Sequence, residues 1–162
     1  MSVFDVTMGI WDFNRSRTIA LLDSIAEEPN AQEILGFRPG EDRAHIAWQL
    51  MHIGVTEELF ATERLLGSTP DFADEVPRFR GGSTPDDDIP TVEQIRSLLD
   101  QSREHLRNTI ANFKESDLSI IPETFKERGW TLAQILQVLA WHEPHHQGQA
   151  HITFNLWKAG QS

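Results

Sequence analysis

The spacing of apolar residues is the feature that most restricts how this chain can fold. Apolar side chains recur at steps of three and four positions through most of the sequence, and strand-like alternation is scarce. Steps of three and four place side chains on one face of an α-helix. Four such segments stand out, so we predict an all-α fold in which four helices form a bundle.

The first two helices differ in the character of their inner face. The first is expected from about Asp5 to Ala26, because Glu28-Pro29-Asn30 continues a helix poorly. The second is expected to begin after Arg38-Pro39-Gly40-Glu41 and to extend to about Leu66. Apolar residues predicted to face the core from the first helix are Ile10, Phe13, Leu21 and Leu22. The second helix instead mixes apolar and imidazole side chains on one face: His45, Trp48, His52, Val55 and Leu59.

Residues 67–90 are rich in Gly, Pro, Ser and Asp, which is the composition of a loop. A loop of this length within a compact domain needs a structural reason. In a four-helix bundle it can be a crossover that joins two helices that are not antiparallel neighbours. A disordered surface insertion is the alternative. We expect the crossover, between the second and third helices.

Capping signatures open the last two helices. Thr91-Val-Glu-Gln94 and Thr131-Leu-Ala-Gln134 both place Gln three residues after Thr, so each pair can satisfy free backbone amides at a helix start. The third helix has an apolar stripe and is expected to be purely structural: Val92, Ile95, Leu99, Leu106 and Phe113. The fourth has a stripe that begins apolar and becomes polar halfway along: Leu132, Ile135, Leu139, His142, His146, Gln149 and Leu156.

Residues 142–151 read HEPHHQGQAH, and the first five fit H-E-x-x-H, the pattern of zinc proteases. A protease of this kind needs a third ligand, yet no Asp or Glu follows His146 in the sequence. The longer pattern H-E-x-x-H-x-x-G-x-x-H is also missed. Gly148 and His151 stand one position early, which is about 100° of rotation on a helix. Pro144 within the motif is expected to kink the helix. Proteolysis is therefore disfavoured.

A di-iron carboxylate site is also disfavoured. Glu143-Pro-His145-His146 contains one of the Glu-x-x-His steps that such bundles use, but they need two, together with two further glutamates. Glu143 lies about 100° from the face that carries His142 and His146, and we expect it to be solvated. The two histidines, four residues apart, can reach one metal ion; the alternative is that they are core residues held by hydrogen bonds.

Composition limits the remaining classes of function. The 162 residues include no cysteine, so any metal must be held by nitrogen and oxygen ligands. The formal net charge of −11 disfavours nucleic acids and anionic membranes as partners. No apolar run is long enough to span a bilayer, and no secretory segment is evident. We therefore expect a cytoplasmic protein with a single domain, residues 1–162.

These features together resemble the DinB-like, or YfiT-like, metal-binding four-helix bundles over nearly the whole chain. The resemblance rests on Arg38-Pro39-Gly40, on HIAWQLMHIG at 45–54, on the long loop, and on HEPHHQGQAH. In that family a histidine of the second helix and two histidines of the last helix bind a divalent metal, often zinc or nickel. The resemblance therefore implies His52, His142 and His146 as the metal ligands.

The family also suggests an activity. Some of its members use a low-molecular-weight thiol as cosubstrate and act as thiol S-transferases or isomerases, so the resemblance implies a metal-dependent enzyme acting on small molecules, and a homodimer. Three neutral histidines with an open fourth position are the layout of a catalytic zinc site. Such a site can bind a thiolate, a nucleophile that this cysteine-free chain lacks. Two alternatives stay open: a non-catalytic metal-binding or regulatory protein, and a bundle with structural histidines only.

The other histidines are not expected to bind the metal. His45 and His52 are seven residues apart, or roughly 10 Å along a helix, so both cannot reach one ion. His45 is expected at the periphery, whereas the apolar setting of His52 keeps its imidazole neutral. We place His105, His145 and His151 at the surface or in packing. Gln149 is expected either to hydrogen-bond a ligand or to pack between helices.

Overall fold

The computed structural model describes residues 1–161, and within them it is helical, with no strand. The predicted all-α class is therefore confirmed. The helices are α1 (Val3–Ala26), α2 (Ala31–Gly36), α3 (Ile46–Leu59), α4 (Glu75–Phe79), α5 (Val92–Ile110) and α6 (Leu132–Gly160). Three short elements complete the set: the π-helix η1 (Phe60–Arg64) and the 3-10 helices η2 (Glu115–Asp117) and η3 (Glu123–Arg128).

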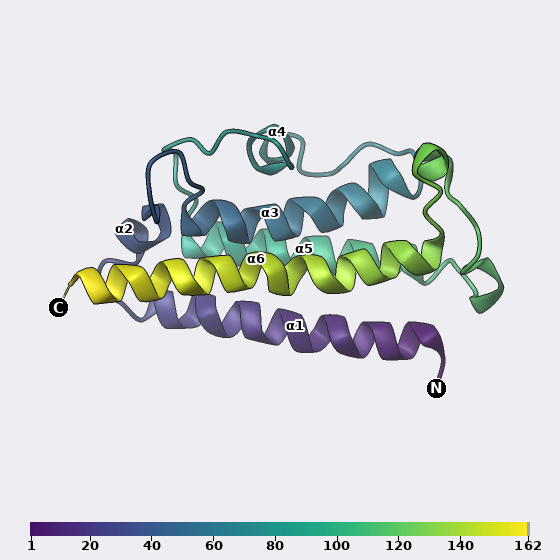
Figure 1. Cartoon of the computed structure of the whole chain (residues 1–162), viewed down its shortest axis with the longest axis horizontal. Helices are drawn as coiled ribbons and strands as arrows, with labels where there is room; N and C mark the ends of the chain where they lie inside the picture. The colour runs from purple at the N-terminus through teal and green to yellow at the C-terminus, as the bar shows by residue number, and fades with distance from the viewer. Residues whose placement is uncertain (162) are drawn as a thin grey trace.

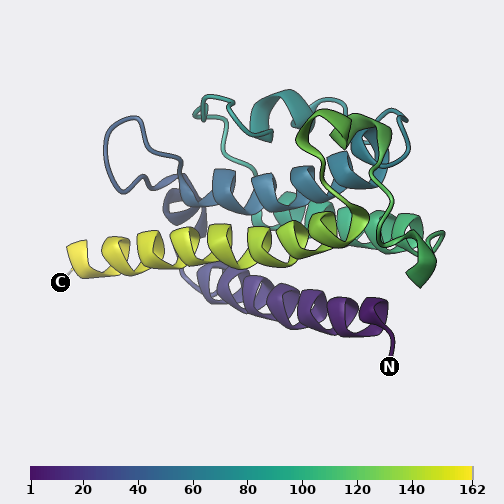
Figure 2. The same ribbon diagram turned by 45° about the vertical axis from the view of Figure 1, so that its right-hand side comes forward.

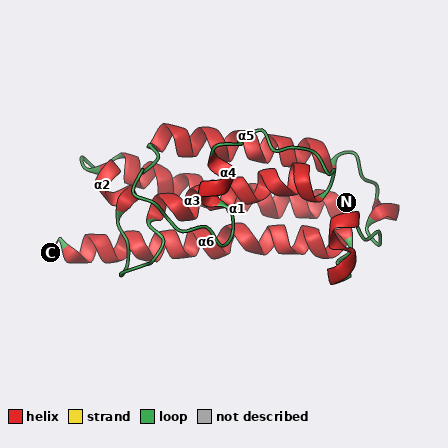
Figure 3. Cartoon of the chain, turned by 90° about the horizontal axis from the view of Figure 1, so that it is seen from above, coloured by secondary structure: helices red, strands yellow, loops and turns green. Residues whose placement is uncertain are grey.

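The four long helices α1, α3, α5 and α6 lie side by side along one axis (Figure 1, and from above in Figure 3). α3 packs against α5 and α6, and α1 packs against the same two helices. α3 and α5 run in one direction, and α1 and α6 run in the other (Figure 1). The segment between α3 and α5, which includes α4, covers the side of α3 away from α1 (Figure 2). None of the helices in the described residues has the length and apolar character needed to cross a membrane.

Local signals at the helix starts agree with the sequence for α5 and α6. Both predicted capping boxes form, with Thr91 and Gln94 at one helix and Thr131 and Gln134 at the other. α3 begins later than expected, at Ile46, because Nδ1 of His45 accepts a hydrogen bond from the backbone N–H of Trp48 and caps the helix. α6 continues through Pro144, so this proline removes a backbone hydrogen bond without ending the helix.

The core face predicted for the first helix was half wrong. Leu21 and Leu22 are buried, but Ile10 is 45% exposed and Phe13 is 67% exposed. Both belong to an outward stripe at steps of three and four, which begins with Val3 and Val6. The inward face carries other residues, among them a charged one: Trp11, Arg15, Thr18, Leu22 and Ile25. Apolar spacing selected the wrong stripe because the true inner face contains an arginine.

A buried quartet of charges joins the four long helices. Each helix contributes one residue: Arg15 from α1, Glu57 from α3, Arg103 from α5 and Glu143 from α6. Arg15 lies 2.9 Å from Glu57 and 2.7 Å from Glu143, and Arg103 contacts the same two carboxylates. All four side chains are almost completely buried. The two cations balance the two anions, so a carboxylate buried here keeps its charge.

The quartet overturns the sequence prediction for Glu143. Glu143 is not solvated: it is only 2% exposed, and its carboxylate accepts hydrogen bonds from Arg15, Arg103 and Thr18. The inner side of α5 carries Arg103 in addition to apolar residues, and its contacts with both carboxylates agree with a structural role for this helix. Charged residues are assigned to the surface by default, and only partners from distant parts of the chain make their burial favourable.

Glu57 shows how the quartet affects stability. Burial alone would raise the pKa of its carboxyl, but the charges of Arg15 and Arg103 outweigh burial and hold the pKa below its ordinary value. A carboxyl whose pKa is lowered by folding stabilises the protein above its unfolded-state pKa. That stabilisation is lost as the pH falls through the folded-state pKa.

We expect Glu57→Gln to lower the free energy of unfolding by roughly 3 to 5 kcal/mol at pH 7, because two buried guanidinium groups lose a counter-charge. Urea titrations should show that the difference in the free energy of unfolding between the variant and the wild type becomes smaller in acid, below the ordinary pKa of a glutamate. Glu104→Gln, at an exposed position of α5, is the matched control and should change stability little. A Glu57→Gln variant as stable as the wild type at pH 7 would contradict the role given to the quartet.

Candidate metal centre

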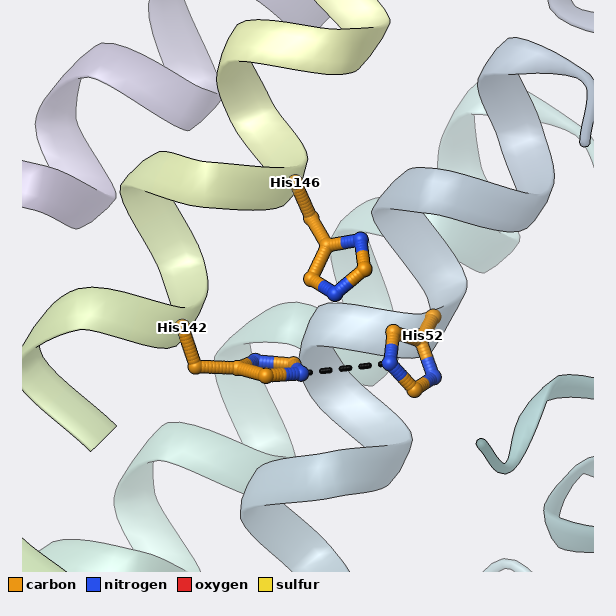
Figure 4. Close-up of side chains that lie close together, drawn as sticks. All are labelled: His52, His142 and His146. Carbon is orange, nitrogen blue, oxygen red and sulfur yellow. Dashed lines mark hydrogen bonds between the residues drawn. The ribbon is translucent and has the colours of Figure 1, made fainter. Parts of the chain in front are cut away.

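Three histidines converge between α3 and α6. His52 comes from α3, and His142 and His146 come from successive turns of α6 (Figure 4). Nε2 of His142 lies 3.1 Å from Nε2 of His52. One ring nitrogen from each histidine lies within 4.8 Å of the others. The three residues singled out by the sequence are therefore brought together, as a group that could hold one metal ion.

Hydrogen bonds on the far side of two rings determine where their protons lie. Nδ1 of His52 is 2.7 Å from the backbone oxygen of Phe79, and Nδ1 of His146 is 2.6 Å from Oε1 of Gln49. Both oxygens can only accept, so each Nδ1 carries the proton and donates it. Each Nε2 is then left with a free lone pair. In Figure 4 the free nitrogen of His146 points into the space between His52 and His142.

The amide of Gln49 is oriented by a second amide. Its Nε2 donates to Oε1 of Gln149 at 3.1 Å, which turns its own oxygen toward His146. Gln149 in turn bonds His145 at 2.8 Å. Gln149 does not contact His146 through this network directly: it accepts a hydrogen bond from Gln49, and Gln49 accepts one from His146. The sequence analysis missed Gln49, although it lies three residues before His52 on the same helix.

Burial keeps the three imidazoles neutral. Burial lowers the pKa of His142 to about 3, with a further contribution from His52. It also lowers the pKa of His146 to about 2, with His142 contributing next, and it lowers the pKa of His52. Trp48 adds to the shielding, since its ring stacks on that of His52 at 4.6 Å. Neutral imidazole is the form that coordinates a metal, so the site needs no deprotonation at neutral pH.

The spacing of two of the three donors fits a tetrahedral ion. With metal to nitrogen bonds of about 2.0 to 2.1 Å, two ligands of a tetrahedral zinc ion lie roughly 3.3 Å apart. The Nε2 atoms of His52 and His142 are 3.1 Å apart. Two lone pairs at that separation repel unless a proton or a cation lies between them. His52 and His142 also line a pocket of about 540 Å³, so the group is open on one side.

A second group of possible ligands lies farther along α3. Glu58, Asp71 and His105 also place donor atoms within 4.8 Å of one another. The buried Glu58 carboxylate already accepts the backbone N–H of Asp71 at 2.8 Å and Nδ1–H of His105 at 2.9 Å. These bonds satisfy the carboxylate without a metal, and they give His105 a packing role.

The prediction for His45 was wrong about its position. His45 is fully buried: it caps α3, and its Nε2 is 3.1 Å from the backbone oxygen of Asp86. Burial, reinforced by the charge of Arg38, lowers its pKa to about 4. Its place was misjudged because residues 67–90 fold back over the start of α3. His145 and His151 are exposed, and His145 stacks on Trp141 at 4.6 Å.

We expect protein purified without a histidine tag to hold about one divalent ion per chain. Replacing His52, His142 or His146 by Ala should lower metal affinity at least about tenfold, because two imidazoles hold an ion less well than three. His45→Ala is the control: it removes a helix cap and should lower stability by about 1 kcal/mol while leaving metal affinity nearly unchanged. Competition with a chromophoric chelator measures all four variants. The reverse pattern, with His45 required and His52 dispensable, would refute the site.

Comparison with known families agrees with the resemblance noted in the sequence. The family model of the DinB superfamily matches residues 10–150, a range that contains His52, His142 and His146. No curated protein matches the chain. Because the match covers most of the sequence, the chain belongs to the DinB superfamily.

Proposed function

We propose that this protein binds one divalent metal ion, zinc or nickel, through His52, His142 and His146, and that it uses the ion to transfer a low-molecular-weight thiol to a small molecule. The observation that carries the proposal is the convergence of three neutral imidazoles, two of which line a pocket. Imidazole ligands suit both metals. A metal bound there would supply Lewis acidity and stabilise a thiolate at neutral pH.

The residues around the ligands support an open, catalytic kind of site. Phe79 and Gln49 hold His52 and His146 with Nε2 directed inward, which prepares the ligands before a metal arrives. Phe60, Phe125 and Trp130 line the same pocket and would exclude water from a bound substrate. A site made only for sequestering a metal would not need this pocket, so an enzyme is favoured over a non-catalytic metal-binding protein.

The position of Glu143 argues against the protease alternative. In H-E-x-x-H proteases the glutamate acts as a general base on metal-bound water. Here both carboxylate oxygens of Glu143 are engaged: one accepts from Arg15 and Thr18 and the other from Arg103. Glu143 therefore has no oxygen free to act on metal-bound water. The same pairing leaves Glu143 unavailable as a ligand of a di-iron site.

We also propose a fold, a cellular location and a class of substrate for the enzyme. We take residues 1–162 as one four-helix bundle in which residues 67–90 are the crossover that supplies the Phe79 carbonyl to His52. A cytoplasmic location agrees with thiol transfer, because low-molecular-weight thiols are kept reduced in the cytoplasm. The net charge of −11 disfavours nucleic acids and anionic membranes as partners, which agrees with a small-molecule substrate.

We also propose a homodimer. Val3, Val6, Ile10 and Phe13 form an exposed apolar stripe along α1. A second copy of the chain could cover this stripe, and burying it would remove apolar surface from water.

The transfer reaction can be tested with monochlorobimane as the electrophile and a small thiol. In this reaction the thiol sulfur bonds to carbon, chloride leaves and the thiol proton passes to solvent. We expect the fluorescence of the product to increase faster with metal-loaded protein than with metal-free protein. His142→Ala should abolish the difference, whereas the exposed His151→Ala should behave as the wild type. Unfolded casein should stay intact. Metal-dependent cleavage of casein, or equal rates with and without metal for several thiols and electrophiles, would count against the proposal.

Light scattering tests the dimer. At micromolar concentration we expect twice the mass of one chain for the wild type and for His151→Ala. Phe13→Glu should give the mass of one chain, because it places a charge in the apolar stripe. A monomer mass for the wild type would refute the dimer.

A further inference from the structure

The pocket beside the histidines contains an arginine that the proposed function does not use. Arg64 lines this pocket together with His52 and His142. It is the last residue of η1, the π-helix that continues α3. Its guanidinium carbon lies 4.5 Å from the centre of the Phe60 ring. π-helical turns are uncommon and often occur at functional sites, and this one sets the direction from which Arg64 enters the pocket.

Arg64 differs from the other partly buried arginines in its lack of a counter-ion. Within residues 1–161, no carboxylate lies within ion-pair distance of its guanidinium. Arg15 and Arg103 each hold two carboxylates, and Arg38 and Arg78 each hold at least one. The remaining arginines without an ion pair in this range, Arg17, Arg43 and Arg128, are exposed to water. A half-buried cation with no counter-ion is costly, and a bound anion would offset that cost.

Charges of both signs line the pocket, since Glu63 and Glu127 lie there with Arg64 and Arg128. Burial lowers the pKa of Arg64, and the charges of Arg80 and Arg128 lower it further, although Glu63 acts in the other direction. Glu63 itself lies 3.9 Å from Arg80. The charge of Arg64 also contributes to the lowered pKa values of His52 and His142, which places it within electrostatic reach of the candidate metal centre.

Part of the pocket wall is aromatic. The rings of Phe60 and Phe125 stack at 5.8 Å, and those of Phe125 and Trp130 stack at 5.7 Å. All three residues line the pocket. An apolar or planar molecule would fit against these rings, with its polar end directed at Arg64.

We propose that this pocket binds a small molecule that carries an oxyanion head group, a carboxylate or a phosphate, with Arg64 as its main contact and Arg128 at the rim. The head group pairs with the guanidinium, the apolar part lies on Phe60, Phe125 and Trp130, and the reacting end faces the three histidines. Only the placement of the reacting end rests on the proposed function; binding of the anion does not require it.

Isothermal titration of the full chain, with and without zinc, tests the pocket directly. The probes are benzoate, phenyl phosphate and the neutral benzamide. We expect one of the two anions to bind at least about tenfold more tightly than benzamide, since a hydrogen bond to a charged group is the stronger kind. The tighter of the two identifies the head group as carboxylate or phosphate.

Arg64→Gln should reduce the affinity for that anion at least about tenfold without lowering zinc affinity, and retained zinc binding also shows that the variant is folded. Arg64→Lys keeps the charge but not the paired donors, so its affinity for the anion should lie between those of the wild type and Arg64→Gln. Arg17→Gln, at an exposed position of α1, is the control and should bind as the wild type.

The outcomes separate this inference from the proposed function. Anion binding that depends on Arg64, in a protein that transfers no thiol, would support the pocket and reject the transferase. Thiol transfer by a protein that binds neither anion better than benzamide would overturn the anion site and leave the transferase standing. Anion binding that is unchanged in Arg64→Gln would also overturn the anion site.

Discussion

The buried quartet of charges is the interaction on which the rest of this structure depends. Each of the four long helices supplies one member, and the ion pairs join residues that are 40 to 128 positions apart. Sliding one helix by a turn would separate two charges in the interior, which is far less favourable than shifting an apolar contact. The quartet therefore fixes the axial register of the helices, a role in specificity more than in net stability.

That register determines where the three candidate metal ligands lie. His52 precedes Glu57 by five residues on α3, and His142 directly precedes Glu143 on α6. When the two carboxylates meet the same arginines, the histidines on the neighbouring faces meet each other. The same helix segments thus contain two polar centres with separate tasks. One is ionic and closed, and the other is neutral and open to a pocket. This separation explains why an H-E-x-x-H sequence here need not form a protease.

The sequence predicted the local features well and the long-range ones poorly. Capping boxes and the i, i+4 histidine pair depend on neighbours within one helix turn, so the starts of α5 and α6 and the pairing of His142 with His146 could be predicted. The choice of His52 needed the family resemblance. Burial of Arg15, Arg103, Glu143 and His45 could not be predicted, because it depends on partners from other helices or from residues 67–90. Apolar spacing also gives no indication of Arg64, because its proposed role depends on the lack of a carboxylate partner within residues 1–161.

The central claim is that three Nε2 lone pairs meet at one metal ion, and nitrogen NMR of the histidine rings tests it most directly. In metal-free protein labelled with ¹⁵N at histidine, we expect neutral rings with the proton on Nδ1 for His52 and His146. One equivalent of zinc should shift the Nε2 signals of His52, His142 and His146 together and leave His45 and His105 unchanged. A zinc response at His45 or His105, or none at the three Nε2 atoms, would contradict the claim.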